Sequence, residues 1–551
     1  MAPIKRSNDS VFWFMNDLTS RIVAESGIPS DRHHLGKMIL QGLKDFPDMV
    51  MQIDGATGET ETNRSALERS VRCAESLRRH GLQAGDVIVL MAPNHLDIAI
   101  PFYAALYLGV MIAAVDRNLS IGELEGTLGV CTPKLIFCQS EKAPDIQLAL
   151  NNIELNSQII TFDKGDYLLS FNEFLAICEE TISIENFRAT EFNPETTSAL
   201  LIATSGTTGL PKAAETTHKN FAITLPYIWA SYMNFPNPTR MAFICSPLQW
   251  LTALIHCIAS PILSYTRLQT SLPLTAEHAC NLIDTYKPTY TVLSPTFLTA
   301  LLGHKDLCDF ASFELIMLGG SAVPVELITK LKSVSPNTDV YNVFGMSELT
   351  GICFTPDFSP PGSCGRPMGC LQYKLLDIET QDEIEEPNVR GELCLKGPGI
   401  FKGYYKNITA TAEAFTEDGW FKTGDMFYRD ENWNFFFCER LKLLLKYKSY
   451  QISPVELENV IRKHPAVLDV AVTGLPDPEC GELPVACVVR RPGYDVNDNE
   501  IINLVQENLS ESKQLRGGVL FMNEIPMTAS TKVHRRKLKE IVLKSCGSQG
   551  C

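Results

Sequence analysis

The sequence has too few basic residues to balance its acidic ones. Its 551 residues include 48 Lys and Arg against 64 Asp and Glu, which gives a formal net charge of −16 at pH 7. Binding along a nucleic-acid backbone or an anionic membrane requires a surplus of cations. The charge balance therefore argues against either as the main function. With 45% hydrophobic and 20% charged residues, the composition is that of an ordinary globular protein, long enough for two to four domains.

Paired cysteines are also lacking. The 17 cysteines are scattered singly, and no two of them have the CxxC spacing of a zinc site. At about 3% of the residues, they are far sparser than in small domains that depend on disulfides. We therefore expect reduced, mostly buried thiols in an intracellular protein.

Long apolar runs are nearly absent. Residues 98–115 (IAIPFYAALYLGVMIAAV) form a strongly apolar, uncharged stretch of the roughly 18 residues at which a membrane span becomes a candidate. Pro101 and Gly109 interrupt it, and Asp116 and Arg117 follow it directly. We interpret the stretch as a buried helix that runs into a buried strand, with a membrane span as the alternative.

Short apolar runs rich in β-formers alternate with amphipathic stretches. The pattern predicts buried strands over residues 87–92, 199–203, 290–293 and 314–318, and helices over residues 65–80 and 324–334. This alternation is typical of a large, multi-layer α/β body with mainly parallel sheets. In such folds ligands bind at the loops beyond the strand ends.

The second half of the sequence changes in character. Turn-rich aromatic strands from Gly391 predict a small β subdomain over about residues 385–438, and the remainder reads as a compact α+β unit. We expect an N-terminal domain of residues 1–438 and a mobile C-terminal domain of residues 439–551, with a hinge at 439–442. The final 113 residues carry a net charge of +2, which leaves −18 for the body. This asymmetry suits closure over a polyanion, although two solvated surfaces explain it equally well.

The strongest motif is Thr204-Ser205-Gly206-Thr207-Thr208-Gly209-Leu210-Pro211-Lys212, which follows the predicted strand 199–203. Its glycines allow a close backbone approach to an anion, its four hydroxyls can donate to phosphate oxygens, and Lys212 adds a positive charge. It is not a Walker A loop, because Leu210 and Pro211 separate Gly209 from Lys212. The motif predicts a phosphate-binding loop, and a plain polar turn is the alternative.

The loop SGTTGLPK resembles the signature of the adenylate-forming superfamily of acyl- and aryl-CoA ligases, firefly-type luciferases and peptide-synthetase adenylation domains. Seven further segments resemble motifs of this superfamily in the same order: 319–323 (GGSAV), 344–348 (FGMSE), 420–425 (WFKTGD), 439–442 (ERLK), 446–451 (KYKSYQ), 515–519 (LRGGV) and 526–532 (PMTASTK). The resemblance extends from about residue 60 to 540 and is greatest to luciferase-related and 4-coumarate-type CoA ligases, insect members especially.

The resemblance implies an ATP-dependent reaction in which a carboxylate attacks the α-phosphate and a thiol then displaces AMP. Lys532 is expected to bridge the carboxylate and the α-phosphate, Glu348 to bind Mg²⁺, and Lys442 to be the pivot of the C-terminal domain. The expected ATP- or AMP-binding residues are Thr204, Ser205, Gly206, Thr207, Thr208, Gly209, Lys212, Gly320, Ser321, Asn342, Phe344, Gly345, Ser347, Asp425 and Arg440, and the expected CoA-binding residues are Lys446, Lys448 and Ser449.

These roles have plainer alternatives. Asp425, expected to accept hydrogen bonds from the ribose hydroxyls, could simply close a turn, and Glu348 could cap a helix. Arg440 and Lys442 could belong to a solvated face, and Lys532 lies in a run of surface-type basic residues. Only the surrounding motif favours function at each position.

The sequence departs from the superfamily pattern at several positions: Ala213, Phe344, Ser347, Asn432-Trp433-Asn434, Ser449 and Thr531. Thr531 replaces a glycine directly before Lys532, where a β-branched residue would misplace the lysine if a positive φ were required. Ser449 replaces a glycine in the loop expected to face CoA, which bears on the thioester step. A protein that binds ATP or acyl-CoA without turnover therefore remains an alternative.

The segment Pro247-Leu248-Gln249-Trp250-Leu251 stands where luciferases and many ligases have a Phe-His-His or Phe-His sequence. Trp250 is expected to be an aromatic gate, and Leu251, with Leu254 and Ile255, to line an apolar pocket; the alternative places Trp250 in the core. Loss of the histidines argues against luciferin oxidation and favours an apolar acid.

We therefore predict an acid–CoA ligase that uses ATP, Mg²⁺ and CoA and activates an apolar carboxylic acid, most simply a medium- or long-chain fatty acid. A luciferase-like oxygenase is the second hypothesis. The start of the chain lacks a signal-peptide pattern, and residues 548–551 (SQGC) are not an SKL-type peroxisomal signal. The cytosol is the expected compartment, with the peroxisome, common among relatives, as second choice.

Overall fold

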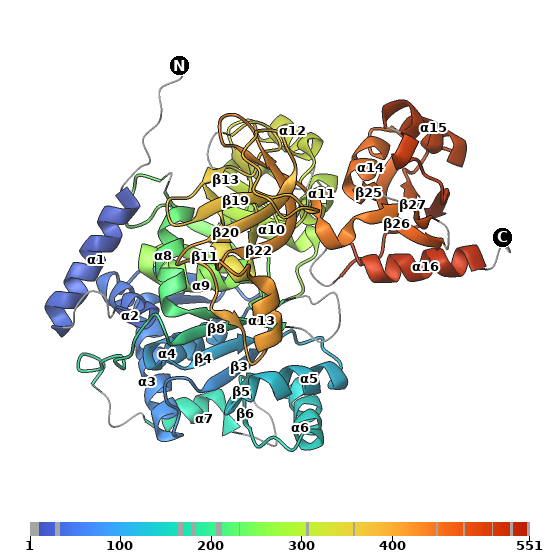
Figure 1. Ribbon diagram of the computed structural model, residues 1–551. Coiled ribbons are helices and arrows are strands. Elements are labelled where there is room, and N and C mark those ends of the chain that lie inside the picture. The colour runs from blue at the N-terminus through green and yellow to red at the C-terminus, as the bar shows by residue number, and fades with distance from the viewer. Residues whose placement is uncertain are drawn as a thin grey trace.

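Two large sheets form the body of the protein in a computed structural model (Figure 1). The structure describes residues 10–27, 33–163, 169–178, 183–204, 212–230, 232–304, 308–355, 359–447, 450–477, 480–509, 511–528 and 533–547. The first sheet contains β1 (Val50–Asp54), β2 (Thr60–Thr62), β10 (Met241–Phe243), β11 (Thr266–Gln269), β12 (Tyr290–Leu293), β13 (Leu315–Leu318) and β14 (Asp339–Asn342). The second contains β3 (Val87–Met91), β4 (Met111–Ala114), β5 (Leu135–Cys138), β6 (Gln158–Thr161), β7 (Leu169–Ser170), β8 (Ser198–Thr204), β9 (Lys212–Thr217) and β21 (Gly403–Tyr404).

Both sheets are mainly parallel. The first has the strand order β14-β13-β12-β10-β11-β1-β2, in which only β2 pairs antiparallel. The second has the order β21-β9-β8-β4-β3-β5-β6-β7, in which β9 and β21 pair antiparallel at one edge. This confirms the predicted α/β body with parallel-rich sheets. Strand β8, which ends at Thr204, pairs parallel with β4.

Helices lie between the two sheets and on their outer faces. The inner layer comprises α2 (Leu35–Asp45), α3 (Asn63–Arg79), α4 (Ala99–Leu108), α8 (His218–Ile228) and α9 (Leu251–Leu263), and their buried side chains share one core cluster with residues of both sheets. The outer helices α10 (Ala276–Tyr286), α11 (Pro295–Gly303) and α12 (Val325–Val334) cover the first sheet, and α5 (Ile121–Cys131) and α6 (Ala143–Asn152) cover the second. The body therefore has five layers.

The uncharged stretch 98–115 consists of α4 and β4. Every residue of α4 is buried, because this helix packs against α2 and α3 in the layer between the sheets. That environment explains its apolar composition, and Gly109 ends the helix with a φ of +72°. Among the described residues, no helix combines the length and apolar character needed to cross a membrane.

A four-stranded antiparallel sheet, β19-β20-β22-β23, follows the body. Its strands are β19 (Gln372–Leu376), β20 (Gly391–Lys396), β22 (Phe421–Arg429) and β23 (Phe435–Arg440), and α13 (Ile408–Ala414) lies beside β22. The sheet begins before the predicted boundary near residue 385. The short strand β19 has no run of aromatic residues to mark it, and its pairing with β20 brings it into the sheet.

The C-terminal unit is a five-stranded sheet between helices (Figure 1). Its elements are β24 (Leu445–Tyr447), β25 (Tyr450–Ile452), α14 (Pro454–Ile461), β26 (Val467–Asp477), β27 (Gly481–Arg490), α15 (Asp498–Asn508), β28 (Val519–Met522) and α16 (Arg535–Gly547). Alternate residues of β26 and β27 face α14 and α15 on one side and α16 on the other. Strands β26 and β27 are long, because Pro476 and Pro484 occupy ladder positions without ending the pairing.

Buried imidazoles make the stability of the body sensitive to acid. His34 stacks on Phe192, with ring centroids 4.0 Å apart, and also contacts His218. Burial lowers the pKa of His218, and that of His256 in α9, from 6.5 to about 3. Neither ring nitrogen of His218 has a hydrogen-bond partner among the described residues. Below pH 6.5 the unfolded chain therefore binds protons that the folded chain excludes, so stability falls.

We expect His218→Leu to flatten this acid dependence. One imidazole with these pKa values lowers the free energy of unfolding by about 1.4 kcal/mol per pH unit below 6.5, or about 2 kcal/mol at pH 5. Urea unfolding between pH 8 and pH 5 should show a slope reduced by that amount in the variant. The exposed His304→Gln serves as the control and should keep the wild-type slope. An unchanged slope in His218→Leu would contradict the argument.

Candidate active site

Asp425 is a buried carboxylate at the end of the β subdomain. Its side chain is 2% exposed and lies opposite Arg440 across β22 and β23, with 3.3 Å between Arg440 Nε and Asp425 Oδ1. Oδ1 nevertheless accepts no hydrogen bond from a described residue. Burial raises the pKa of this carboxyl from 3.8 to about 6, against the opposing charges of Arg440 and Lys442. A buried acceptor with spare capacity suits a ligand that carries hydroxyl donors.

A bulge in β22 holds Asp425 in place. The register between β20 and β22 shifts at Thr423-Gly424, where Gly424 has a φ of +69°. Glu392 Oε1 accepts from the Gly424 N–H at 3.1 Å, and the Thr423 hydroxyl accepts from the Asp425 N–H at 3.1 Å while donating to Leu393 O at 2.8 Å. The bulge therefore has partners for its backbone donors and fixes the direction of the Asp425 side chain.

Glu348 is a second buried carboxylate. It lies in the 3₁₀ turn η6 (Ser347–Leu349), and 6% of the residue is exposed. Its backbone carbonyl accepts from Phe401 N at 2.8 Å, and Oε1 accepts from the Tyr404 hydroxyl at 2.9 Å. The second carboxylate oxygen is left for other contacts. The plainer expectation, that Glu348 caps a following helix, does not hold, because β16 (Gly351–Ile352) follows the turn.

Lys212 lies where the predicted phosphate loop returns to the sheet. It pairs with Thr204 in the β8–β9 ladder, the Thr204 hydroxyl donates to Lys212 O at 3.1 Å, and Lys212 Nζ lies 5.0 Å from the centre of the Tyr404 ring. Residues 205–211, which include Ser205, Gly206, Thr207, Thr208 and Gly209, lie outside the described residues. Both ends of the loop therefore lie at one edge of the second sheet.

The charged residues that the sequence singled out lie within electrostatic range of one another. Partial burial and Arg440 lower the pKa of the Lys442 ammonium, Asp425 and Glu348 raise it, and Lys212 lowers it further. Asp425 likewise interacts with Glu348. Three cations and two carboxylates drawn from four separate motifs are thus gathered in one region. Their surplus of one positive charge suits an anionic ligand.

The remaining predicted nucleotide residues lie on loops and strand ends. Asn342 ends β14 and donates to Gly362 O at 3.3 Å, and Phe344 packs edge-on against Phe427 with ring centroids 4.8 Å apart. The other members are Gly320, which has a φ of +86°, Ser321, Gly345 in β15 (Gly345–Met346), and Ser347 in η6. Gly320, Ser321 and Gly345 are exposed.

Several predicted residues are not placed. Lys448, Ser449, Thr531 and Lys532 lie outside the described residues, and of Lys446 only the backbone, within β24, is described. Of the other departures, Ala213 pairs with Ala203 in β9, and Trp433 adopts a φ of +61° where the family pattern has a glycine turn. Asp430 stabilises that turn by accepting from the backbone N–H groups of Asn432 and Asn434.

The predicted acyl-pocket residues lie at the start of α9. Trp250 is the N-cap residue of this helix, and Trp250 and Leu251 are both half-buried, so Trp250 is not a core residue. A Cβ added to Gly351 would lie 3.6 Å from Ile255 Cδ1 and 3.8 Å from Ile228 Cδ1. These apolar side chains therefore border the segment that carries Glu348.

Two residues of the site were not predicted from the sequence. Glu392 fixes the bulge below Asp425, and Tyr404 contacts both Glu348 and Lys212. The only signals were the Gly391-Glu392 that opens an expected strand and the Gly403-Tyr404-Tyr405 that follows it. Both look like ordinary strand residues until the pairing of β21 with β9 is known.

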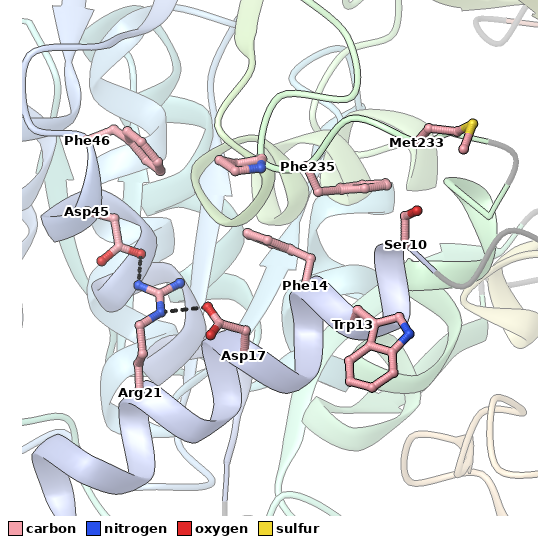
Figure 2. A pocket seen from close by; sticks show the side chains of 10 residues that line it. Ser10, Trp13, Phe14, Asp17, Arg21, Asp45, Phe46, Met233 and Phe235 are labelled. Carbon is pink, nitrogen blue, oxygen red and sulfur yellow. Dashed lines mark hydrogen bonds and ion pairs between the residues drawn. The ribbon is translucent and has the colours of Figure 1, made fainter.

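A separate groove of about 760 Å³ lies between α1 (Ser10–Ser26), the end of α2 and the Phe235-Pro236 segment (Figure 2). Phe14 and Phe235 stack across it, and Arg21 pairs with Asp17 at 3.0 Å and with Asp45 at 2.6 Å. Its lining includes none of the residues singled out above.

Comparison with known proteins identifies the family. The model of the AMP-binding enzymes matches residues 41–405, and that of the AMP-binding enzyme C-terminal domain matches residues 456–532. The chain therefore belongs to the AMP-binding enzyme family, which confirms the predicted resemblance.

The chain is similar to both luciferases and CoA ligases. It is 31% identical to the luciferin 4-monooxygenase of Photuris pensylvanica over 523 residues, 92% of this chain and 95% of that protein. It is 29% identical to 4-coumarate–CoA ligase 1 of Narcissus pseudonarcissus over 535 residues, 94% and 95% of the two chains. The crystal structure of the anthranilate CoA ligase AuaEII in complex with anthranoyl-AMP superposes with a TM-score of 0.83 at 22% identity, over 95% of this chain and 99% of that one. This likeness confirms the predicted fold.

Proposed function

We propose that the protein is an ATP-dependent acid–CoA ligase whose substrate is an apolar carboxylic acid, a medium- or long-chain fatty acid in the simplest form. The observation that carries the proposal is the meeting of Lys212, Glu348, Asp425, Arg440 and Lys442 at one site, where Oδ1 of Asp425 accepts no hydrogen bond from a described residue. A site rich in cations and poor in acid–base pairs suits a reaction between two anions, because its main task is to bring them together.

The chemistry takes two steps. A carboxylate oxygen of the acid attacks the α-phosphorus of ATP, and the bond to pyrophosphate breaks. The thiolate of CoA then attacks the acyl carbon, and AMP leaves. In this scheme Asp425 accepts from the ribose hydroxyls, Phe344 stacks on adenine, Lys212 and the loop 204–209 bind phosphate, and Lys532 holds the carboxylate against the α-phosphate. Asn342, Gly320, Ser321, Gly345 and Ser347 complete the nucleotide site.

The residues present fit Mg²⁺ bound together with a nucleotide. Of the two Glu348 carboxylate oxygens, only Oε1 accepts a side-chain hydrogen bond from a described residue, and a carboxylate oxygen is a hard ligand of the type that Mg²⁺ prefers. No three His, Cys, Asp or Glu side chains in the described part of the chain gather as a metal site of their own. This agrees with a cation held jointly by one carboxylate and substrate phosphates. When bound, Mg²⁺ would neutralise phosphate charge.

We propose further that residues 439–551 act as a mobile lid on residues 1–438, with Lys442 as the pivot. Lys442 already lies near Asp425, Glu348 and Lys212, which supports a position over the nucleotide site. In a second orientation of the lid, Lys446, Lys448 and Ser449 would meet CoA. Trp250 and Leu251 border the acyl pocket in this proposal.

A panel of carboxylic acids tests the proposal. Wild type should release pyrophosphate in an acid-dependent manner, and CoA should then release AMP. Lys532→Ala should lower acid-dependent pyrophosphate release at least tenfold, because the cation between two anions is lost. The exposed Lys544→Ala is the control and should match wild type. Unchanged release in Lys532→Ala would remove that residue's role, and no release by wild type with any acid would refute the ligase.

The similarity to luciferin 4-monooxygenase makes an adenylate-oxidising enzyme the second candidate. The same panel separates the two. An oxygenase would consume O₂ or emit light with a luciferin after pyrophosphate release, whereas a ligase would form a thioester only when CoA is added. ATP binding without pyrophosphate release would instead indicate a protein without turnover.

A further inference from the structure

Tyr404 connects two motifs that lie far apart in the sequence. Its strand, β21, pairs antiparallel with β9, so that Tyr404 is the register partner of Ala214, two residues after Lys212. The Tyr404 hydroxyl donates to Glu348 Oε1 at 2.9 Å, and its ring lies 5.0 Å from Lys212 Nζ. One side chain therefore contacts the candidate metal ligand through its hydroxyl and the candidate phosphate ligand through its ring.

The surroundings hold the Tyr404 ring in place. The ring of Phe401 packs against it edge-on, with centroids 5.0 Å apart, and the backbone N–H of Tyr404 donates to the Thr411 hydroxyl at 2.8 Å. The hydroxyl donor that faces Glu348 is thus fixed in position.

If the Tyr404 hydroxyl were absent, the Glu348 carboxylate could pair with a nearby ammonium group instead. Glu348 and Lys212 both lie within electrostatic range of Lys442. A buried carboxylate beside mobile ammonium groups would be expected to form an ion pair with one of them. Such a pair would occupy the oxygen needed for a metal ion and the cation needed for phosphate.

We propose that Tyr404 is a positioning residue that keeps Glu348 and Lys212 apart and ready for a metal–nucleotide complex. Its hydroxyl occupies Oε1 of Glu348 and leaves Oε2 for the metal, and its ring retains Lys212 by a cation–π contact. The two contacts use different parts of the side chain, so substitutions can separate them. The inference rests on the proposed function only in assuming that the site binds ATP with Mg²⁺.

Calorimetric titration with ATP, in MgCl₂ or in EDTA, tests this role without any knowledge of the acid. Tyr404→Phe keeps the ring and loses the hydroxyl, so we expect the Mg²⁺-dependent gain in ATP affinity to fall at least fivefold while the affinity in EDTA stays within twofold of wild type. Tyr404→Leu loses both contacts and should weaken binding in both buffers. Electron paramagnetic resonance of Mn²⁺ with ATP should show weaker metal retention in Tyr404→Phe.

Tyr405→Phe is the matched control. Tyr405 is the next residue, and its ring lies 5.0 Å from Lys406 Nζ on the body surface. This variant should bind ATP as wild type does in both buffers. If Tyr404→Phe weakens binding equally with and without metal, or not at all, the positioning role is overturned. If wild type itself binds no ATP in either buffer, the proposed function fails instead, so the two failures are distinct.

Discussion

Asp425→Asn is expected to stabilise the ligand-free protein while weakening its binding of ATP. The folded protein holds a buried carboxyl whose pKa is raised from 3.8 to about 6, so ionisation at neutral pH opposes folding. Asparagine resembles the protonated carboxyl and removes this cost. A shift of about two pKa units corresponds to about 3 kcal/mol in the free energy of unfolding above pH 6.

The pH dependence of the free energy of unfolding tests the direction of this effect a second time. A raised carboxyl pKa means that the folded state binds more protons than the unfolded state between pH 3.8 and 6, so this group lowers wild-type stability as the pH rises through that window. The loss is complete above pH 6. Urea unfolding of Asp425→Asn should lack this component, and its gain over wild type should vanish below pH 3.8.

ATP binding should change in the opposite direction. The amide is uncharged and has one acceptor oxygen in place of two, so the hydrogen bonds it accepts from the ribose hydroxyls are weaker than those to a carboxylate. Loss of a hydrogen bond to a charged group costs about 1.5–3 kcal/mol, which corresponds to roughly a 10- to 100-fold loss of affinity by calorimetry. The exposed Asp418→Asn, on the same β subdomain, is the control and should leave ATP binding unchanged. Wild-type affinity in Asp425→Asn would contradict the ribose assignment, and unchanged stability would contradict the buried-charge argument.

The sequence was sufficient for features that depend on local pattern. The apolar stretch 98–115 identified a buried helix and strand, because a segment between two sheets has no solvent-facing side to mark with charge. The predicted strand before the Gly- and Thr-rich motif is likewise present, as β8. These predictions depended on residues that are adjacent in sequence.

Features that depend on pairing between distant strands could not be predicted from the sequence. The contact of Tyr404 with Glu348 requires β21 to add to the edge of the second sheet, and nothing in Gly403-Tyr404 specifies that partner. The Glu392 contact with Gly424 similarly depends on a register shift between β20 and β22. Motif resemblance located the charged residues of the site, but the residues that hold them in place became visible only through the sheet topology.

The buried pair Glu458–Arg535 is expected to dominate the stability of the C-terminal unit. Glu458 Oε1 accepts from Arg535 Nη1 at 2.7 Å and from Val472 N at 2.8 Å, and the Glu458 side chain is 5% exposed. Glu458→Ala would leave the Arg535 guanidinium without its carboxylate, with Val472 O at 2.6 Å as its remaining acceptor, at a cost of about 3 kcal/mol because the Arg535 side chain is 23% exposed. The exposed pair Arg536–Glu540 on α16 offers the control, since Glu540→Ala should cost less than about 0.5 kcal/mol.

A double-mutant cycle separates the pair from its surroundings. Glu458→Leu with Arg535→Met removes both charges and retains apolar volume, so the double variant should be more stable than the two single losses together imply. Arg535 lies three residues after Lys532, and Val533, which stands between them, forms an isolated β-bridge with Met527. We therefore expect the adenylation activity of the double variant to recover together with its free energy of unfolding, measured by urea unfolding. Additive losses in the cycle would show that the ion pair is not what holds α16 on the sheet.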